Sequence, residues 1–113
     1  RTTTDMAASI AFYRDRLGLR LLYSFEGMAF FDLGGTRLYL QQGTEAGPES
    51  ILYFQVSDIA AAHAALLARG IAFTREPALV HRHPDGTEEW LAFFADPEGR
   101  PLALIAQRPP ADP

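Results

Sequence analysis

The order of hydrophobic and polar positions predicts one helix in each half of the chain. Four apolar residues recur at helical spacing in the first half: Met6, Ile10, Tyr13 and Leu17. Asp5 precedes this stripe and Gly18 follows it, and these residue types commonly begin and end helices. Asp58 and Gly70 flank a second stretch, rich in Ala and Leu, in the same way. We therefore expect one helix between each Asp and its Gly.

Strands are predicted where apolar and β-prone residues lie between groups of turn-forming residues. These runs are 19–25, 28–33 and 37–42 in the first half, and 51–56, 71–74, 79–83, 87–95 and 101–107 in the second. The expected turns between them are Gly34-Gly35, Pro84-Asp85-Gly86 and Asp96–Gly99. Each half then has the element order β-α-β-β-β.

The two halves also resemble each other in sequence. Residues 5–19 reappear as residues 58–71, and Met28–Leu40 reappears as Leu91–Leu104. Such a repeat is expected to fold as two β-α-β-β-β modules related by a pseudo-twofold axis. The order of helix and hairpin favours an α+β fold with mixed, curved sheets and helices on the outer face.

Turn-rich segments predict where the modules begin and end. We expect a first module over 1–42, a linker over 43–50, a second module over 51–107 and a frayed tail over 108–113. At 113 residues, the whole chain is expected to be one domain.

The amino-acid composition indicates a globular protein and argues against several functional classes. Hydrophobic residues make up 48% of the sequence, as in globular proteins, and the net charge of −4 argues against nucleic-acid binding. The sequence has no cysteine, which excludes a disulfide framework, a zinc–thiolate site and a thiol nucleophile. Neither an apolar run of membrane-spanning length nor a signal peptide is visible, so we expect a cytoplasmic protein without membrane contact.

Two motifs carry a family resemblance. They are Phe12-Tyr13-Arg14-Asp15-x-Leu17-Gly18-Leu19 and Phe94-x-Asp96-Pro97-x-Gly99. Together they resemble the hallmark motifs of the vicinal oxygen chelate superfamily, which includes glyoxalase I, bleomycin-resistance proteins, fosfomycin-resistance enzymes and extradiol dioxygenases. The resemblance covers nearly the whole chain and implies a single domain with the glyoxalase/bleomycin-resistance fold. It does not imply one activity, because a fold hosts many chemistries.

The resemblance to metal-dependent members implies four inward positions that hold a divalent metal, on the first and last strand of each module. They normally carry His, Gln or Glu, and the metal acts as a Lewis acid on vicinal substrate oxygens. Three of these positions are Tyr39, Ala103 and Ile51, and the fourth precedes Arg1. A shift of one residue brings in only Leu and Ser: Leu38, Ser50, Leu52, Leu102 and Leu104. We therefore expect the usual metal site to be absent and no cofactor to be bound.

The hairpin turns predict which residues face each other across neighbouring strands. The expected pairs are Phe30 with Tyr39, Met28 with Gln41, Phe93 with Ala103, and Leu91 with Ile105. Alternation along the strands extends this face into a pocket. Its predicted lining is Met28, Phe30, Tyr39, Gln41, Ile51, Tyr53, Gln55, Glu89, Leu91, Phe93 and Ala103. Such a lining suits an amphipathic organic ligand. The alternative is that the apolar members are core residues and the tyrosines point to solvent.

Glu89 is the candidate catalytic base of this lining. Catalysis would require burial, which raises the pKa of a carboxyl toward that of a general base; the alternative is a solvated strand edge. His81 and His83 lie on one face of a strand, so with Glu89 they form an alternative metal site. Otherwise the two histidines are polar residues that lead into the Pro84-Asp85-Gly86 turn.

The sequence supports three hypotheses about function. The first is a metal-independent binding module, a homodimer that holds a small hydrophobic or aromatic molecule, as in the bleomycin-resistance type. The second is a glyoxalase-like lyase or dioxygenase that uses Glu89, His81 and His83. The third is a regulatory or structural domain whose sheet is covered by a partner chain. The sequence does not distinguish an antibiotic, a keto-acid adduct or a catechol as the ligand.

Overall fold

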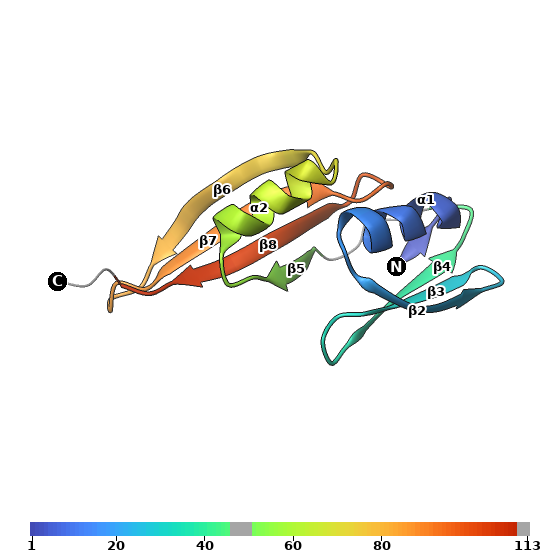
Figure 1. The fold of residues 1–113 in the computed structure, drawn as a ribbon, viewed down its shortest axis with the longest axis horizontal. Coiled ribbons are helices and arrows are strands. Elements are labelled where there is room, and N and C mark those ends of the chain that lie inside the picture. The colour runs from blue at the N-terminus through green and yellow to red at the C-terminus, as the bar shows by residue number, and fades with distance from the viewer. Residues whose placement is uncertain (46–50, 111–113) are drawn as a thin grey trace. The chain divides into compact units, whose positions relative to one another are not determined.

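The computed structural model describes residues 1–45 and 51–110. These residues contain two four-stranded sheets (Figure 1). The elements of the first half are β1 (Thr2–Thr3), α1 (Met6–Ile10), the π-helical segment η1 (Ala11–Arg16), β2 (Arg20–Phe25), β3 (Met28–Asp32) and β4 (Arg37–Gln42). Those of the second half are β5 (Leu52–Gln55), α2 (Ile59–Ala68), β6 (Phe73–Arg82), β7 (Glu88–Ala95) and β8 (Pro101–Arg108).

The two sheets share one strand topology. Their strand orders are β1-β4-β3-β2 and β5-β8-β7-β6. In each sheet the first strand of the module pairs in parallel with the last, and the other neighbours are antiparallel. Each half is therefore a β-α-β-β-β module with a mixed sheet, and the predicted α+β fold class is confirmed.

The chain divides into two compact units. Of the described residues, the first unit contains 1–45 and Asp96–Arg100. The second unit contains 51–95 and 101–110. The turn between β7 and β8 thus belongs to the first unit, although its flanking strands belong to the second. Because β8 extends to Arg108, the strand takes in the first residue of the predicted tail. Residues 46–50 of the predicted linker and 111–113 of the tail lie outside the described residues.

The first helix begins as predicted and then widens. Asp5 Oδ1 accepts a hydrogen bond from Ala8 N at 3.0 Å, which caps the first turn. In η1 the helix adopts π geometry, and Leu17 N donates to the carbonyl of Phe12, five residues earlier. Gly18 follows with a φ of 83°, the left-handed conformation that ends many helices.

The π segment changes which side chains of this helix are buried. The buried residues are Ser9, Phe12 and Tyr13. Three members of the predicted stripe are only half-buried: Met6, Ile10 and Leu17. The Tyr13 ring packs between Phe12 at 5.2 Å and Phe31 at 5.7 Å, between ring centroids. The predicted helix is present, and its wider turn moves the residues after Ile10, Leu17 among them, around the helix axis.

Strand register follows the turns, as predicted. Phe30 pairs with Tyr39, Met28 with Gln41, Phe93 with Ala103, and Leu91 with Ile105. A two-residue turn, Glu26-Gly27, joins β2 to β3, and both residues have positive φ angles, 38° and 80°. Two positive φ angles match a type I′ turn, whose twist suits a hairpin.

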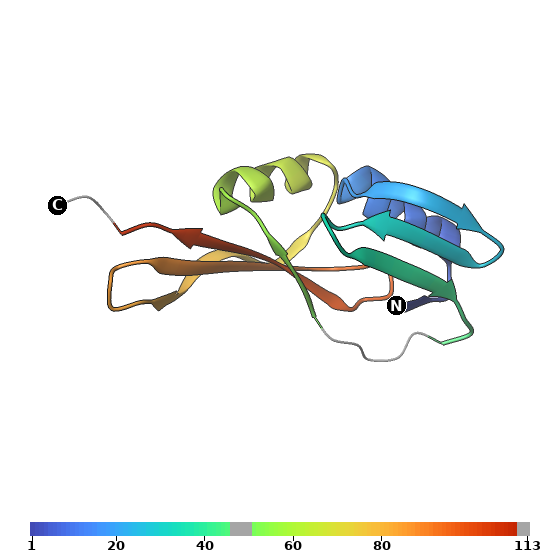
Figure 2. The same cartoon turned by 90° about the horizontal axis from the view of Figure 1, so that it is seen from below.

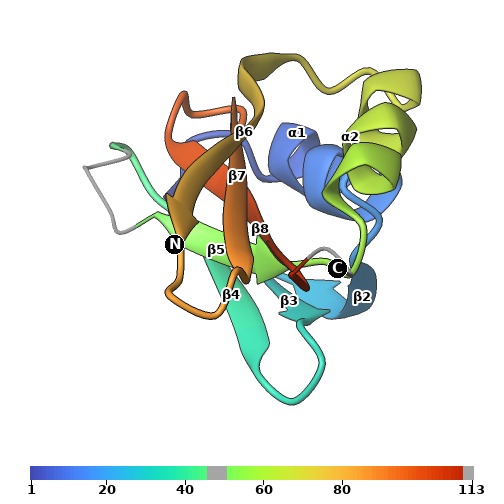
Figure 3. The same ribbon diagram turned by 90° about the vertical axis from the view of Figure 1, so that its left-hand side faces the viewer.

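The second helix is also capped as predicted. Asp58 Oδ1 accepts from Ala61 N at 3.1 Å, and Gly70 follows the helix with a φ of 88°. Helix α2 packs on one face of β6, β7 and β8, as Figure 3 shows. In the first unit, Figure 2 shows the helix on one side of its strands. Among the described residues, no helical segment has the length and hydrophobicity needed to span a bilayer.

Strand β6 corrects the prediction of two short strands at 71–74 and 79–83. It is one strand from Phe73 to Arg82 that continues through Pro77. Pro77 is tolerated because β6 lies at the sheet edge, where a missing amide hydrogen breaks no ladder. The register between β6 and β7 shifts between Arg75 and Ala78, so the irregularity surrounds the proline.

The hydrophobic core lies on one face of each sheet. In the first unit its strand residues are Ala29, Phe31, Leu38 and Leu40. In the second they are Ala92, Phe94, Leu102, Leu104 and Ala106, whereas Ala103, also buried, pairs with Phe93 on the opposite face. The residues that alternate with these along β3 and β7 are half-buried and outside the core: Met28, Phe30, Leu91 and Phe93. Each sheet therefore keeps a second, more open face.

Candidate functional site

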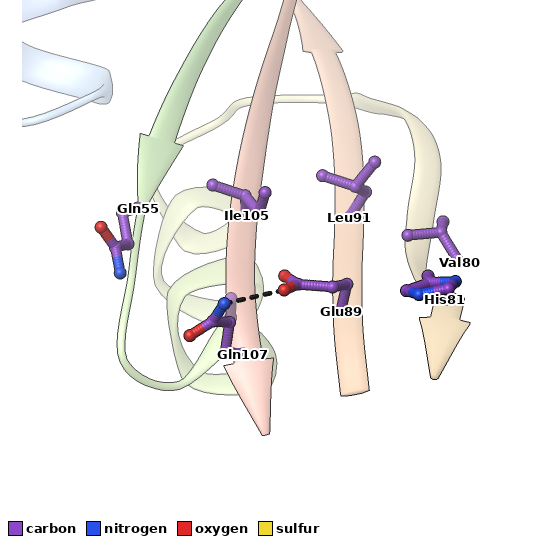
Figure 4. Close-up of a pocket in the computed structure, with 8 residues that line it drawn as sticks. Gln55, Val80, His81, Glu89, Leu91, Ile105 and Gln107 are labelled. Carbon is purple, nitrogen blue, oxygen red and sulfur yellow. Dashed lines mark hydrogen bonds between the residues drawn. The ribbon is translucent and has the colours of Figure 1, made fainter. Parts of the chain in front are cut away.

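A hollow of about 420 Å³ lies on the open face of the second sheet. Its walls are Gln55, Val80, His81, Glu89, Leu91, Ile105, Ala106 and Gln107. Figure 4 shows the labelled side chains projecting from four neighbouring strands, β5 to β8. The hollow is therefore built by the second unit alone.

Strand pairing brings these walls together. Glu89 pairs with Gln107 and Leu91 with Ile105 across β7 and β8, while Gln55 pairs with Ile105 across β5 and β8. Residues two apart on a strand point to the same face, so the polar pair and the apolar pair lie side by side. Leu91 and Ile105 therefore give the hollow an apolar surface, and Gln55, Glu89 and Gln107 place polar side chains beside it.

Glu89 is the one acidic residue among the described walls of the hollow. Its Oε1 atom accepts a hydrogen bond from His83 Nε2 at 2.9 Å and another from Gln107 Nε2 at 2.7 Å. The side chain is only 18% exposed. The hydrogen bond from His83, and then that from Gln107, hold the pKa of Glu89 below its usual range. Glu89 is thus an ionised carboxylate at neutral pH.

This environment bears on the predicted catalytic role of Glu89. A general base at neutral pH needs a raised pKa, and the shift here runs the other way. The cause is hydrogen bonding to the charged form, which outweighs the desolvation of the carboxyl. Glu89 is therefore better suited to act as a permanent negative charge than as a general base.

The structure brings His81, His83 and Glu89 together. The rings of the two histidines lie 4.6 Å apart, edge to face, and His83 contacts Glu89. Nevertheless, within residues 1–45 and 51–110 no group of three or more His, Asp or Glu side chains has an arrangement that could hold a metal ion. The geometry does not support the alternative metal site, because His83 Nε2 and Glu89 Oε1 bind each other.

The positions that usually hold a metal in this fold do not fit one here. Tyr39 is a phenol and 37% exposed, Ala103 is fully buried, and Ile51 is apolar. None of these side chains supplies the imidazole or carboxylate that a divalent ion requires. These three residues do not fit a divalent metal, and no chemistry is assigned to one.

The remaining predicted lining residues are not among the walls of this hollow. In the first unit, the open face carries Met28, Phe30, Tyr39 and Gln41. Phe93 lines a second, smaller hollow of about 240 Å³ beside β6, together with Leu91. Tyr53 is 51% exposed, whereas Ala103 has no exposed surface and so offers no contact.

The first sheet also carries an aromatic stack that the sequence did not reveal. Phe30 stacks on Tyr23 at 4.7 Å and on Tyr39 at 4.8 Å, between ring centroids. Tyr39 was predicted from the hairpin turn, but Tyr23 was missed because the register of β2 against β3 depends on a bulge between Leu21 and Tyr23.

Of the walls of the hollow, the sequence predicted Gln55, Glu89 and Leu91. It proposed His81 only as a metal ligand. Val80 was missed because simple alternation places it on the face opposite His81, whereas the register of β6 shifts between Leu79 and His81 and both residues line the hollow. Ile105 and Gln107 follow Ala103 at intervals of two on β8, so the same alternation would have found them.

Comparison with known proteins establishes the family. A model described as the Glyoxalase/Bleomycin resistance protein/Dioxygenase superfamily matches residues 1–104. The chain belongs to this superfamily, which confirms the resemblance inferred from its two motifs. No match was found among curated proteins.

Solved structures support the same fold. The chain is similar to a glyoxalase/bleomycin resistance protein/dioxygenase from Nocardioides, with 26% identity and a TM-score of 0.72 over 99% of this chain and 82% of that one. A counterpart from Alicyclobacillus acidocaldarius has 18% identity and a TM-score of 0.75, over 94% and 86%. One from Burkholderia phytofirmans has 17% identity and a TM-score of 0.75, over 94% and 93%. The last two likenesses concern the fold alone.

Proposed function

We propose that this protein binds a small organic molecule with a hydrophobic or aromatic body, without a metal, in the hollow of the second sheet. The observation that carries the proposal is the hollow itself: about 420 Å³, with apolar walls and a few polar groups. Ligand sites for small molecules have volumes of about 300 to 1,000 Å³ and this mixture of walls.

The chemistry of the walls supports binding over catalysis. Leu91, Ile105 and Val80 supply apolar surface for the body of the ligand. Gln55 and Glu89 supply polar contacts that can orient it. Since the pKa of Glu89 is lowered by its hydrogen bonds from His83 and Gln107, this carboxyl is poorly suited to proton transfer at neutral pH.

A titration followed by NMR tests the proposal. Aromatic amines, alcohols and acids are added to ¹⁵N-labelled protein, and we expect amide shifts concentrated at Gln55, Leu91 and Ile105. Ile105→Trp fills the hollow and should abolish them. Leu67→Trp is the matched control, because Leu67 is an exposed residue of α2 and should leave binding intact. Equal binding by both variants would show that the ligand lies elsewhere.

Metal content separates this proposal from its rival. Elemental analysis of protein purified without chelators is expected to show no stoichiometric metal, and Zn²⁺, Ni²⁺, Mn²⁺ and Fe²⁺ should leave the Tm unchanged. A bound metal that His81→Ala with His83→Ala removes would instead favour a lyase or dioxygenase with a non-standard ligand set. The homodimer stays a prediction, which light scattering of the purified protein tests.

A further inference from the structure

We propose that the hollow of the second sheet selects ligands that carry an ammonium group next to their apolar body, and that Glu89 is the residue that recognises it. This inference rests on the proposed function, since it assumes that the hollow is the binding site. It adds the charge of the ligand, which the family does not specify.

The first observation is the incomplete coordination of the Glu89 carboxylate. Both hydrogen bonds that it accepts, from His83 and Gln107, end at Oε1. Among the described residues no donor bonds to Oε2. A half-buried carboxylate gains most from a charged donor, because charge-assisted hydrogen bonds are shorter and stronger than neutral ones. The two donors at Oε1 also fix the orientation of the carboxylate, so little side-chain freedom is lost on binding.

The second observation is that neither an Arg nor a Lys side chain among the described walls of the hollow competes for this carboxylate. Among the described residues that line the hollow there is no Arg, and the sequence contains no Lys. The two arginines of the neighbouring strand ends have other partners. Arg82 donates to Glu88 at 2.7 Å, and the Arg108 guanidinium lies 4.1 Å from the centre of the Trp90 ring.

Strand alternation keeps those arginines on the other face. Glu88 and Trp90 flank Glu89 along β7, so their side chains point away from the hollow. Arg108 likewise follows Gln107 on β8. The charge that Glu89 places at the hollow is therefore negative, and a cation is its complement.

The third observation is the apolar surface beside the charge. Leu91 lies two residues from Glu89 on β7, and Ile105 lies two residues from Gln107 on β8. Apolar walls lower the local dielectric, which strengthens an ion pair whose cation is brought in by a bound apolar body. The chemical class that fits is an arylalkyl or alkyl amine, whereas a carboxylic acid would meet a like charge.

The test compares three probes of one skeleton: 2-phenylethylamine, 2-phenylethanol and 3-phenylpropionate. We expect the amine to bind at least about tenfold more tightly than the alcohol, and the acid more weakly than either. Glu89→Gln keeps the size of the side chain and one oxygen that can accept from His83 and Gln107, and it removes the charge. It should bring the amine down to the affinity of the alcohol and leave the alcohol unchanged.

Glu88→Gln is the matched control, because it removes the same charge one residue away on the opposite face. It should keep the preference for the amine. Wild-type protein supplies a further measurement, since raising the ionic strength should weaken binding of the amine more than binding of the alcohol.

The outcomes separate the two proposals. Binding of the alcohol without a preference for the amine, or a preference that survives in Glu89→Gln, overturns the ammonium site but leaves the proposed function standing. A lack of binding by all three probes at the hollow overturns both. If Glu89→Gln unfolds, the salt dependence of the two wild-type affinities decides: equal dependence rejects the ion pair.

Discussion

Asp96 is a buried acidic residue whose two carboxylate oxygens both accept hydrogen bonds. Its side chain is 1% exposed, and Oδ2 accepts from Tyr13 Oη at 3.2 Å, Arg1 Nη1 at 3.3 Å and Arg100 Nε at 3.1 Å. Oδ1 accepts from the amides of Glu98 and Arg100. The aspartate of the second family motif thus has a physical role, which is to hold the turn between β7 and β8 in the first unit.

Asp96→Asn tests this role. The change leaves the buried Arg100 guanidinium, 7% exposed, without its carboxylate. Breaking a buried ion pair from one side costs about 3 to 5 kcal/mol, so the free energy of unfolding in urea should fall by that order. Asp15→Asn is the control, since the Arg14–Asp15 pair is exposed and should contribute little. A loss no larger than that of the control would refute the role.

Tyr13 predicts how stability changes at alkaline pH. Burial of its hydroxyl, and then the charge of Asp96, raise the pKa of Tyr13 far above its usual 10.0. The unfolded chain ionises near pH 10.0 while the folded chain keeps the proton, so stability is complete below that pH and is lost as pH rises above it. Tyr13→Phe should be slightly less stable at neutral pH and should lose less stability between pH 9 and pH 11, as measured by urea unfolding.

At the scale of elements, the tightest turn of the first sheet carries a residue that fits it poorly. Glu26 has a φ of 38°, and every other residue with positive φ in the described chain is Gly. Left-handed conformations cost most L-residues about 1 to 2 kcal/mol, but Asn adopts them readily. In the Glu26-Gly27 turn, Gly27 therefore adopts its positive φ without strain, whereas Glu26 destabilises the turn.

Glu26→Asn is expected to stabilise the protein by up to about 1 kcal/mol, because Asn-Gly is the preferred sequence of this turn. Thermal unfolding followed by circular dichroism measures the effect. Glu26→Ala is the matched control, since it removes the same charge without favouring a positive φ. Should Ala stabilise as much as Asn, the effect would come from the charge and the turn argument would fail.

Elements were predictable from the sequence where a local signal decided the structure. Asp5 and Asp58 marked the helix starts, and Gly34-Gly35 set a register that brought Phe30 opposite Tyr39. Prediction failed where long-range pairing overrode the local signal. Pro77 indicates a break in isolation, yet β6 passes through it because β7 supplies hydrogen bonds on one side only.

The candidate site was only partly predictable for the same reason. Alternation along β7 identified Glu89 and Leu91, since it needs no knowledge of neighbours. The charge state of Glu89 depends on His83 and Gln107, which approach it from other segments of the chain. The sequence therefore located the carboxylate but not the hydrogen bonds that lower its pKa.

At the scale of the whole molecule, the internal repeat accounts for the framework that the two halves share, and the halves differ in the side chains on their open faces. The two modules share strand order and capped helices, while their open faces have diverged. The first carries the stack of Tyr23, Phe30 and Tyr39, and the second carries the hollow around Glu89. Membership of the superfamily fixes the common framework, and the chemistry must be sought in the differences.

The placement of the Asp96–Arg100 turn in the first unit has a consequence for folding during synthesis. Thr3 and Tyr13 reach hydrogen-bond partners in this turn that lie 95 and 83 residues later. The first module therefore leaves the ribosome well before the residues that complete it. A peptide of residues 1–50 should accordingly exchange its strand amide hydrogens faster than the full chain does. Although it is synthesised first, the first unit is complete only after most of the second has been made.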